Sequence, residues 1–276
     1  MSRSAKDNLM KALIYLSAFF CVAILVWLIA YVVIRGLPHL SWSFLTNDYH
    51  PDHTGGIFPM VVSTLYLIGA SLLIATPLGI FSAIYLTEYA KQGRLVNLIR
   101  FATESLSGIP SIIYGLFGML FFVTTLKMGF SILAGAATVS IMILPTIIRT
   151  TEEAIKSVPR GFREGSLALG ASKLRTLARV VIPSALPGII TAILLSVGRV
   201  IGETAAIYLP VGTHYKMPEN LMSSGRTLSV HLYILAKEGI SFEMAFATGT
   251  VLVLTILVIN FLTRILEKKL SVGGRR

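Results

Sequence analysis

Six long apolar stretches constrain this sequence more than any other feature. Five of them contain no Asp, Glu, Lys or Arg, and each is long enough to cross a bilayer core of roughly 30 Å, which takes about 20 helical residues. The stretches cover residues 13–34, 60–87, 105–126, 128–148, 180–209 and 244–263. Because only helices and closed barrels satisfy their backbone groups in lipid, the sequence predicts an all-α, polytopic membrane protein with six transmembrane helices.

The charged residues gather between these stretches. Only 13% of the residues are charged, against about 25% in an ordinary soluble domain, although the net charge is +11. A basic face with aromatics on a soluble fold would indicate nucleic-acid binding, whereas this arrangement predicts contact with membrane lipid and no nucleic-acid partner. The single cysteine, Cys21, lies inside the first stretch, which excludes a disulfide framework and a cysteine-based metal site.

The positions of Lys and Arg predict the orientation of the helices. Of the 24 basic residues, 18 lie on the side that holds both termini, five lie on the other side, and Arg199 lies within the fifth stretch. Because cytoplasmic segments carry the excess of Lys and Arg, both termini are predicted to be cytoplasmic. The predicted organisation is a cytoplasmic tail at residues 1–12, a six-helix membrane domain at 13–266 and a second cytoplasmic tail at 267–276.

Proline and glycine interrupt several of the predicted helices. Pro77, Pro110, Pro145 and Pro187 lie in the second, third, fourth and fifth stretches, respectively. Such residues are tolerated where neighbouring helices or a wet cavity satisfy the freed backbone groups, so they suggest a bundle around a pathway. The alternative is that proline is simply more frequent in membrane helices than in soluble ones.

Two pairs of glycines predict close helix packing. Gly198 and Gly202 form a G-x-x-x-G pair, and Gly115 with Gly118 forms a similar notch. Such pairs let helix backbones approach one another closely. The spacing leaves open whether the partner helix belongs to this chain or to another.

The cytoplasmic segment 149–183 predicts two short helices beneath the membrane. Pro159 is suited to open the first helix, Gly170 to end it, and Ser172 to cap a second helix that runs to Pro183. Small residues in the first helix are bordered by apolar ones, which gives a compact knob that fits another protein's groove. The small residues are Gly165, Ser166 and Ala168, and the apolar ones are Phe162, Leu167 and Leu169.

The same segment resembles the coupling loop of ATP-binding-cassette importer permeases. The family pattern is Glu-Ala-Ala, three residues, Gly, nine residues, Ile, one residue and Leu-Pro. At these positions this sequence has Glu164, Gly165, Ser166, Gly170, Val180, Ile182 and Pro183. The replacements keep size and polarity, so the resemblance implies a coupling helix that docks on a cytoplasmic ATPase.

The resemblance extends over residues 76–210 and narrows to phosphate importer permeases of the PstA type. The matching segments are Thr76-Pro77-Leu78-Gly79-Ile80, Tyr85-Leu86-Thr87-Glu88-Tyr89, Pro110-Ser111-Ile112, Ile148-Arg149-Thr150-Thr151-Glu152 and Arg199-Val200-Ile201-Gly202-Glu203-Thr204-Ala205. The resemblance implies the type I importer permease fold and a subunit that moves inorganic phosphate across the inner membrane of a prokaryote by alternating access. The residues it assigns to ATPase coupling are Phe162, Arg163, Glu164, Gly165, Ser166, Leu167 and Gly170.

The family also implies the partners and cofactors. They are a homologous permease subunit, a cytoplasmic ATPase dimer and an external phosphate-binding protein. The sequence contains no Gly-Lys dipeptide and hence no Gly-x-x-x-x-Gly-Lys-Ser/Thr phosphate loop, so it is not expected to be an enzyme. ATP and Mg are expected on the ATPase, with no catalytic residue, cofactor or metal on this chain.

Arg199, Glu203 and Arg149 are the candidate residues of the substrate pathway. An arginine at bilayer depth costs about 2.5–3.5 kcal/mol on the insertion scale, so Arg199 needs a partner or a wet pathway. Four residues apart on a helix, Arg199 and Glu203 are able to form an ion pair that only stabilises the bundle. Alternatively, the Arg199 guanidinium binds a pair of phosphate oxygens, which Glu203 weakens enough to permit release. Arg149 is a second candidate contact or an ordinary interfacial charge.

Other functions remain as alternatives. Within the family they are the homologous partner permease or a permease for sulfate or molybdate; outside it, an ATP-independent channel or secondary transporter, for which inverted repeats or several intramembrane charges would be expected. His50 and His53, flanked by Asp48 and Asp52, resemble metal ligands only weakly, and no metal site is expected there.

Overall fold

A computed structural model describes residues 3–50, 55–91 and 93–273, and every regular element within these ranges is helical. The all-α prediction is therefore confirmed. The α-helices are α1 (Arg3–Gly36), α2 (Trp42–Thr46), α3 (Phe58–Ile84), α4 (Arg94–Ser107), α5 (Ser111–Gly118), α6 (Ile132–Lys156), α7 (Arg160–Ala168), α8 (Lys173–Thr176), α9 (Ile182–Gly202), α10 (Ala205–Val211), α11 (Leu228–Lys237) and α12 (Phe242–Gly273). A 3-10 turn spans Leu37–His39, and π-helical turns span Tyr85–Tyr89, Met119–Thr125 and Leu177–Val181.

Five helical segments in the described part of the chain are long and apolar enough to cross a membrane, and a sixth span is possible if one bent pair counts as a single span. The predicted third span, residues 105–126, is the exception. The chain breaks before Ser111, and the helices on either side of the break meet at 99°. Pro110 accounts for this break, because it has no N–H to continue the hydrogen-bond ladder of α4, which ends at Ser107 with Gly108 as its C-cap. The predicted tails are partly helical, since α1 begins at Arg3 and α12 continues to Gly273.

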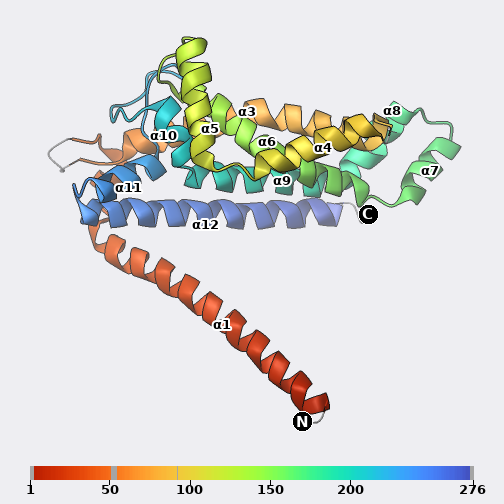
Figure 1. The fold of residues 1–276 in the computed structure, drawn as a ribbon, viewed down its shortest axis with the longest axis horizontal. Helices are drawn as coiled ribbons and strands as arrows, with labels where there is room; N and C mark the ends of the chain where they lie inside the picture. The colour runs from red at the N-terminus through yellow and green to blue at the C-terminus, as the bar shows by residue number, and fades with distance from the viewer. Residues whose placement is uncertain (1–2, 51–54, 92, 274–276) are drawn as a thin grey trace.

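Helices α3, α4, α6, α9 and α12 lie roughly along one direction and form a bundle with two distinct ends (Figure 1). The short helices α7 and α8 lie at one end, close to the last residues of α12. Helices α10 and α11 lie at the opposite end, where α12 begins, and α5 stands steeply to the long axis. The basic segment 149–183 and the start of α4 are thus brought to the same end of the bundle.

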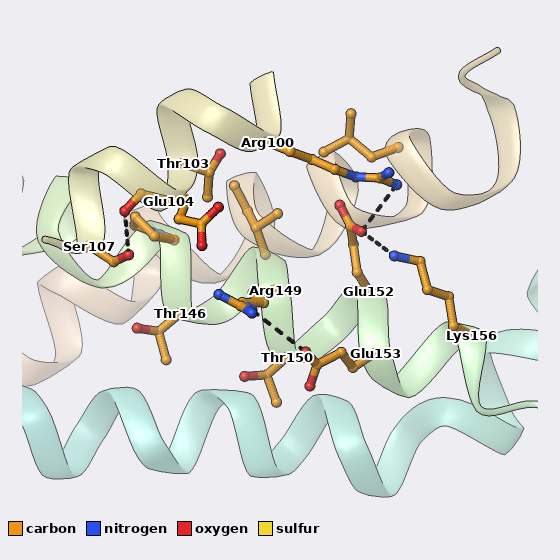
Figure 2. Close-up of a pocket in the computed structure, with 13 residues that line it drawn as sticks. Arg100, Thr103, Glu104, Ser107, Thr146, Arg149, Thr150, Glu152, Glu153 and Lys156 are labelled. Atoms are coloured by element: carbon orange, nitrogen blue, oxygen red, sulfur yellow. Dashed lines mark hydrogen bonds and ion pairs between the residues drawn. The ribbon is translucent and has the colours of Figure 1, made fainter. Parts of the chain in front are cut away.

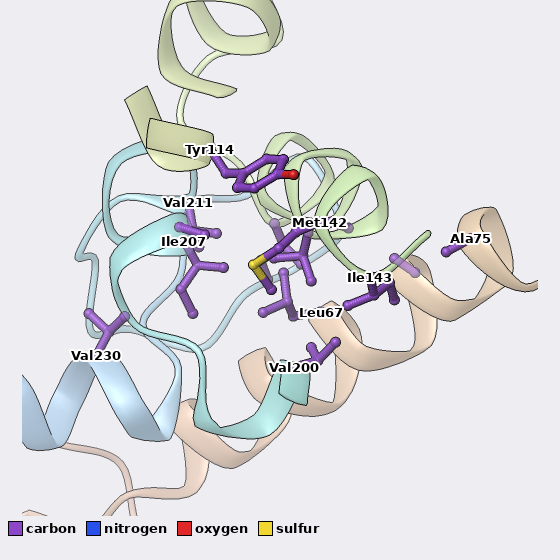
Figure 3. Close-up of a cluster of buried hydrophobic side chains, with 14 of the residues drawn as sticks. Leu67, Ala75, Tyr114, Met142, Ile143, Val200, Ile207, Val211 and Val230 are labelled. Atoms are coloured by element: carbon purple, nitrogen blue, oxygen red, sulfur yellow. The ribbon is translucent and has the colours of Figure 1, made fainter. Parts of the chain in front are cut away.

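The main core forms where α3, α6, α9 and α10 meet (Figure 3). Leu67, Ile143 and Ile207 are fully buried there, and Val200 is nearly so. In lipid the surroundings are as apolar as the side chains, so close packing rather than escape from water holds such helices together. A second cluster, around Ile155, Val181 and Ile189, joins the end of α6 to α9 close to α7.

Small residues let α3 and α6 approach closely. A Cβ on Gly79 would lie 2.5 Å from the Ile147 side chain, and the Ser140 hydroxyl donates to the Ser71 carbonyl oxygen at 3.0 Å across the same interface. The predicted notch at Gly115 and Gly118 is also used, since a Cβ on Gly118 would lie 2.1 Å from Thr138 of α6. These contacts fix α3, α5 and α6 to one another.

Among the described residues, the last turns of helix α1 are the part that contacts α12. The Thr250 hydroxyl of α12 donates to the Val32 carbonyl oxygen at 3.2 Å, and Tyr31 packs against Phe246 with the ring centroids 5.7 Å apart. A Cβ on Gly36 would lie 2.1 Å from Thr250, so the two backbones are in close contact there. From this contact α1 diverges from the bundle, and its apolar residues are exposed (Figure 1).

Candidate functional site

A charged cavity of about 490 Å³ lies between α4 and α6 (Figure 2). Its walls carry three basic and three acidic side chains together with four hydroxyls. The basic residues are Arg100, Arg149 and Lys156; the acidic ones are Glu104, Glu152 and Glu153; the hydroxyls belong to Thr103, Ser107, Thr146 and Thr150. Of these, sequence reasoning had selected only Arg149 as a site residue.

Glu152 is the buried member of this group. Its side chain is 8% exposed, and its Oε2 lies 2.6 Å from Lys156 Nζ and 3.5 Å from Arg100 Nη2. The pair with Arg100 ties α4 to α6, whereas Lys156 lies one turn further along α6. A buried carboxylate that lost both partners would carry a large desolvation cost, so this triad fixes the wall of the cavity. The spacing of Glu152 and Lys156, four residues apart on α6, could have identified this half of the triad from sequence, whereas Arg100 comes from another helix.

Arg149 is more loosely held. Its Nε lies 3.6 Å from Glu153 Oε1, and the two side chains are 70% and 68% exposed. Exposed ion pairs of this kind contribute only about 0–1 kcal/mol. An anion that entered the cavity would therefore displace Glu153 from Arg149 at low cost.

Arg199 and Glu203 do not form the ion pair that their spacing predicted. Helix α9 ends at Gly202, and Glu203 has extended backbone angles, so the two residues no longer share a helical face. Glu203 Oε1 instead accepts a hydrogen bond from the backbone N–H of Ala206 at 3.1 Å, at the start of α10. Arg199 Nη1 lies 3.5 Å from the hydroxyl of Thr146, which also lines the cavity.

Within the described residues no carboxylate oxygen lies within 4.0 Å of the Arg199 guanidinium. Its hydrogen-bond partner in this part of the chain is instead a neutral hydroxyl, that of Thr146. Through Thr146, Arg199 is next to the wall of the cavity that also holds Arg149. The structure thus brings two of the three predicted pathway residues to one region of the bundle.

Gly198 and Gly202 face open space. No atom in the described part of the chain lies within 4 Å of a Cβ built on either residue. The close packing predicted for this pair therefore has no partner among the described residues. The notch at Gly115 and Gly118, by contrast, is filled from within.

The first helix of the coupling segment ends as the sequence predicts, but the second does not stop at Pro183: α8 continues through the π-helical turn at Leu177–Val181 into α9, so that one helix runs from Lys173 to Gly202. Gly170 has φ +82°, a left-handed conformation that glycine adopts without steric cost. Its N–H donates to the Leu167 carbonyl oxygen at 2.9 Å, and the N–H of Ala171 donates to the Ser166 carbonyl oxygen at 3.2 Å. This pair of bonds is the Schellman motif that ends a helix at glycine. Ser172 then caps α8 by accepting from the N–H of Arg175.

The candidate coupling residues point in two directions. Phe162 and Leu167 are 56% and 49% exposed, and Glu164 is also exposed, so these side chains are free to contact another protein. Arg163 turns inward, where its Nη2 lies 3.1 Å from Glu88 Oε1. The Ser166 hydroxyl also turns inward and lies 2.9 Å from that of Thr176.

At the opposite end of the bundle, Arg226 is held in an aromatic cluster that sequence reasoning missed. Its guanidinium lies over the rings of Tyr49 and Tyr215, and its Nε donates to the Thr213 carbonyl oxygen at 2.9 Å. Burial, together with the Arg226 charge, lowers the pKa of His231 from 6.5 to about 3, so this imidazole is neutral at physiological pH. The cluster anchors the loop before α11.

The weak metal pattern near His50 is only partly described, because His53 and Asp52 lie outside the described residues. The absence of a metal there stays a prediction.

Comparisons with known proteins agree with the helical architecture and the coupling segment. Residues 75–272 match the family described as "Binding-protein-dependent transport system inner membrane component". The chain is 37% identical over 281 residues to the probable ABC transporter permease protein YqgI of Bacillus subtilis, with 96% of each chain covered. It is 32% identical to the phosphate transport system permease protein PstA of Pasteurella multocida, with 95% of each chain covered.

Solved structures show the same fold at low sequence identity. A bacterial alginate ABC transporter, solved with an alginate pentasaccharide-bound periplasmic protein, has a chain that matches with a TM-score of 0.72 and 16% identity, over 97% of this chain and 96% of that one. The MetNI methionine ABC transporter, in an inward-facing conformation, has a chain that matches with a TM-score of 0.62 and 19% identity, over 78% and 94%. This chain therefore belongs to the family of inner membrane components of binding-protein-dependent transport systems, and phosphate permeases named PstA are among its relatives.

Proposed function

We propose that this chain is the permease subunit of an ATP-driven importer that moves inorganic phosphate across the cytoplasmic membrane by alternating access. The observation that carries the proposal is the similarity to PstA proteins from several bacteria over about 95% of the chain. Arg199, which contacts Thr146, and Arg149, which lines the same cavity as Thr146, supply the chemistry. Arginine presents a planar fork of donors that matches a pair of phosphate oxygens, which a lysine ammonium matches less well.

Weak binding suits a pathway of this kind. A passing anion must leave as well as enter, so a site that holds phosphate tightly would slow transport. Arg149 has a loosely held counter-ion in Glu153, which is able to compete for the guanidinium once phosphate has passed. The Glu203 side chain accepts a hydrogen bond from the backbone N–H of Ala206, so its main role is to cap the start of α10.

The proposed partners fit the surfaces that the chain leaves uncovered. The exposed apolar side chains of Phe162 and Leu167 suit insertion into a groove of a cytoplasmic ATPase, two copies of which would hydrolyse ATP with Mg. The open face at Gly198 and Gly202 suits close contact with a helix of a homologous permease subunit. An external phosphate-binding protein would deliver the substrate to the opposite end of the bundle. Because ATP and Mg would bind to the ATPase, this chain would hold no cofactor of its own.

We predict that both termini are cytoplasmic. The end of the bundle that carries α7 also carries the segments richest in Lys and Arg, in agreement with the positive-inside rule. Fused after Arg276, a reporter enzyme that works only in the cytoplasm is expected to be active, and one that works only outside it is expected to be inactive. Tags inserted at Asp52 and Glu219 should react with a reagent that cannot cross the membrane and is added from outside. An externally exposed C-terminus would exclude the six-span topology.

Uptake measurements test the proposed function directly. Cells that lack only this chain are expected to lose high-affinity uptake of radiolabelled phosphate and to regain it when the chain is restored. Excess unlabelled sulfate or molybdate should leave the restored uptake unchanged, because these oxyanions are the substrates of the alternative permeases. Suppression of phosphate uptake by sulfate or molybdate would assign the chain to one of them, and uptake that persists without a functional ATPase would indicate a channel or a secondary transporter.

A further inference from the structure

Glu88 lies where three helices meet at the end of the bundle that carries α7. It sits in the π-helical turn that ends α3, and its side chain is only 15% exposed. Glu88 Oε1 accepts from Arg163 Nε at 3.2 Å, and Arg163 Nη2 lies 3.1 Å away from the same oxygen. This contact joins α7 to α3 across 75 positions of the sequence.

Arg163 also binds the end of α6. Its Nη1 donates to the Val158 carbonyl oxygen at 2.6 Å and its Nη2 to the Ile155 carbonyl oxygen at 2.7 Å. These carbonyls lie at the C-terminal end of α6, where backbone acceptors lack helical partners and a cation is favoured by the helix dipole. One guanidinium thus holds the ends of α3 and α6 together and attaches both to α7.

Lys173 adds a second attachment to the end of α3. Its Nζ donates to the backbone carbonyl oxygen of Glu88 and lies 4.7 Å from the ring centroid of Tyr89. The start of α8 is thereby fixed to the same π-helical turn as α7. Turns of this kind often mark functional sites in helices, because they interrupt the regular hydrogen-bond ladder.

One of the two helices joined by Arg163 carries pathway residues. Arg149 and Thr146 lie on α6 a few turns before its end, and α3 packs along α6 through the close contact at Gly79. A displacement of α7 is therefore passed to α3 and α6 as one unit through charge-assisted hydrogen bonds, which are stronger than neutral ones. Without the Glu88 contact, Arg163 would still attach α7 to the end of α6 but no longer to the end of α3.

We infer that Glu88 is a positioning residue that, through Arg163, transmits the movement of the coupling helix to α3 and α6. The inference rests on the proposed function, because it assumes that an ATPase moves α7. It assigns a role to Glu88, and it gives Arg163 a role within the chain in place of the ATPase contact predicted from sequence. In this arrangement Glu164, Phe162 and Leu167 face the ATPase while Arg163 faces the bundle.

The Glu88→Ala variant, in the assembled complex reconstituted into liposomes, tests this role. It leaves the bonds of Arg163 to α6 and of Lys173 to the backbone in place, so the complex should assemble. We expect ATP hydrolysis to continue while the phosphate moved per ATP falls about tenfold, since one charge-assisted contact biases a two-state equilibrium by about that factor. Glu88→Gln, which keeps an acceptor oxygen, should give an intermediate ratio, and Asp7→Ala, an exposed carboxylate on α1, should match wild type.

A purely structural role gives a different result. Glu88→Ala would then lower the amount of assembled complex, while the complex that did form would move a wild-type amount of phosphate per ATP. Either that result or a wild-type ratio with wild-type assembly would overturn the inference.

A measurement that does not depend on phosphate separates this inference from the proposed function. Cys21→Ser provides a cysteine-free background, in which spin labels at Arg160→Cys and Tyr85→Cys report the distance between α7 and the end of α3. The distance is expected to stay constant when nucleotide is added, and to change with nucleotide once Glu88→Ala is introduced. Absence of phosphate uptake by the wild-type complex would refute the proposed function alone, whereas a nucleotide-dependent distance in the wild type would refute the transmission role.

Discussion

Phosphate uptake should fall at least about a hundredfold when Arg199 is replaced by Gln, because two charge-assisted hydrogen bonds to the anion are lost, each worth about 1.5–3 kcal/mol. The amount of assembled complex should stay near that of wild type, since no described carboxylate pairs with Arg199 and its contact with Thr146 is long, at 3.5 Å. Uptake of radiolabelled phosphate and the yield of purified complex measure the two quantities. Arg35→Gln, which removes an exposed arginine at the end of α1, serves as the matched control.

The double variant Arg199→Gln with Glu203→Gln tests whether these two side chains act independently, as expected if they form no ion pair. Residues that do not touch each other have nearly additive effects. The Glu203 side chain caps α10, and glutamine keeps the oxygen that accepts from Ala206. The double variant should therefore transport no better than Arg199→Gln alone. Restored uptake would show that the two charges are coupled after all, and wild-type uptake in Arg199→Gln would remove this residue from the pathway.

Gly170→Val should uncouple ATP hydrolysis from transport. A β-branched residue resists the left-handed conformation at φ +82°, with a cost of about 1–2 kcal/mol or more, so the Schellman motif that ends α7 would be distorted. We expect the complex to insert and hydrolyse ATP, while phosphate uptake falls at least about tenfold because α7 no longer ends where the ATPase groove requires. Paired assays of hydrolysis and uptake in liposomes measure the ratio.

Two further variants isolate the conformation of Gly170. Asparagine tolerates the left-handed region, so Gly170→Asn should retain most of the uptake. Gly239 has a similar φ of +63° at the end of α11, far from α7, and Gly239→Val should leave the coupling ratio unchanged. Efficient uptake by Gly170→Val would mean that the end of α7 plays no part in coupling.

Sequence reasoning found the features that depend on local chemistry. Apolar runs located the long helices because hydrocarbon imposes a minimum length on any spanning helix. Pro159, Gly170 and Ser172 delimited the coupling segment because each has a strong preference for one position at a helix end. These preferences act within a few residues, so they are visible without a structure.

Helix ends were predicted less completely than helix positions. Pro110 marked an interruption of residues 105–126, but neither hydropathy nor a proline gives the angle of 99° at which the two helices meet there. The spacing of Arg199 and Glu203 allowed an ion pair on one helical face, whereas α9 ends at Gly202, before Glu203. In both places the geometry depends on where a helix ends, which composition does not show.

Long-range contacts were beyond sequence reasoning altogether. Arg163 was assigned to the ATPase because it lies in the coupling motif, but its partner Glu88 is 75 positions away. The cavity wall formed by Arg100 and Glu152 likewise joins two helices that are distant in sequence. Only the packing of α3, α4 and α6 brings these charges together.

The way α1 is attached has a consequence for biogenesis. The helix is synthesised first, yet the hydrogen bond between Val32 and Thr250 joins it to a residue made 218 positions later. At about 5–20 residues per second, the ribosome needs about 10–45 seconds to supply that partner. During this interval α1 must reside in lipid without its protein neighbour. The exposed apolar side chains along most of α1 are suited to lipid before its last turns meet α12, which makes this waiting period thermodynamically tolerable.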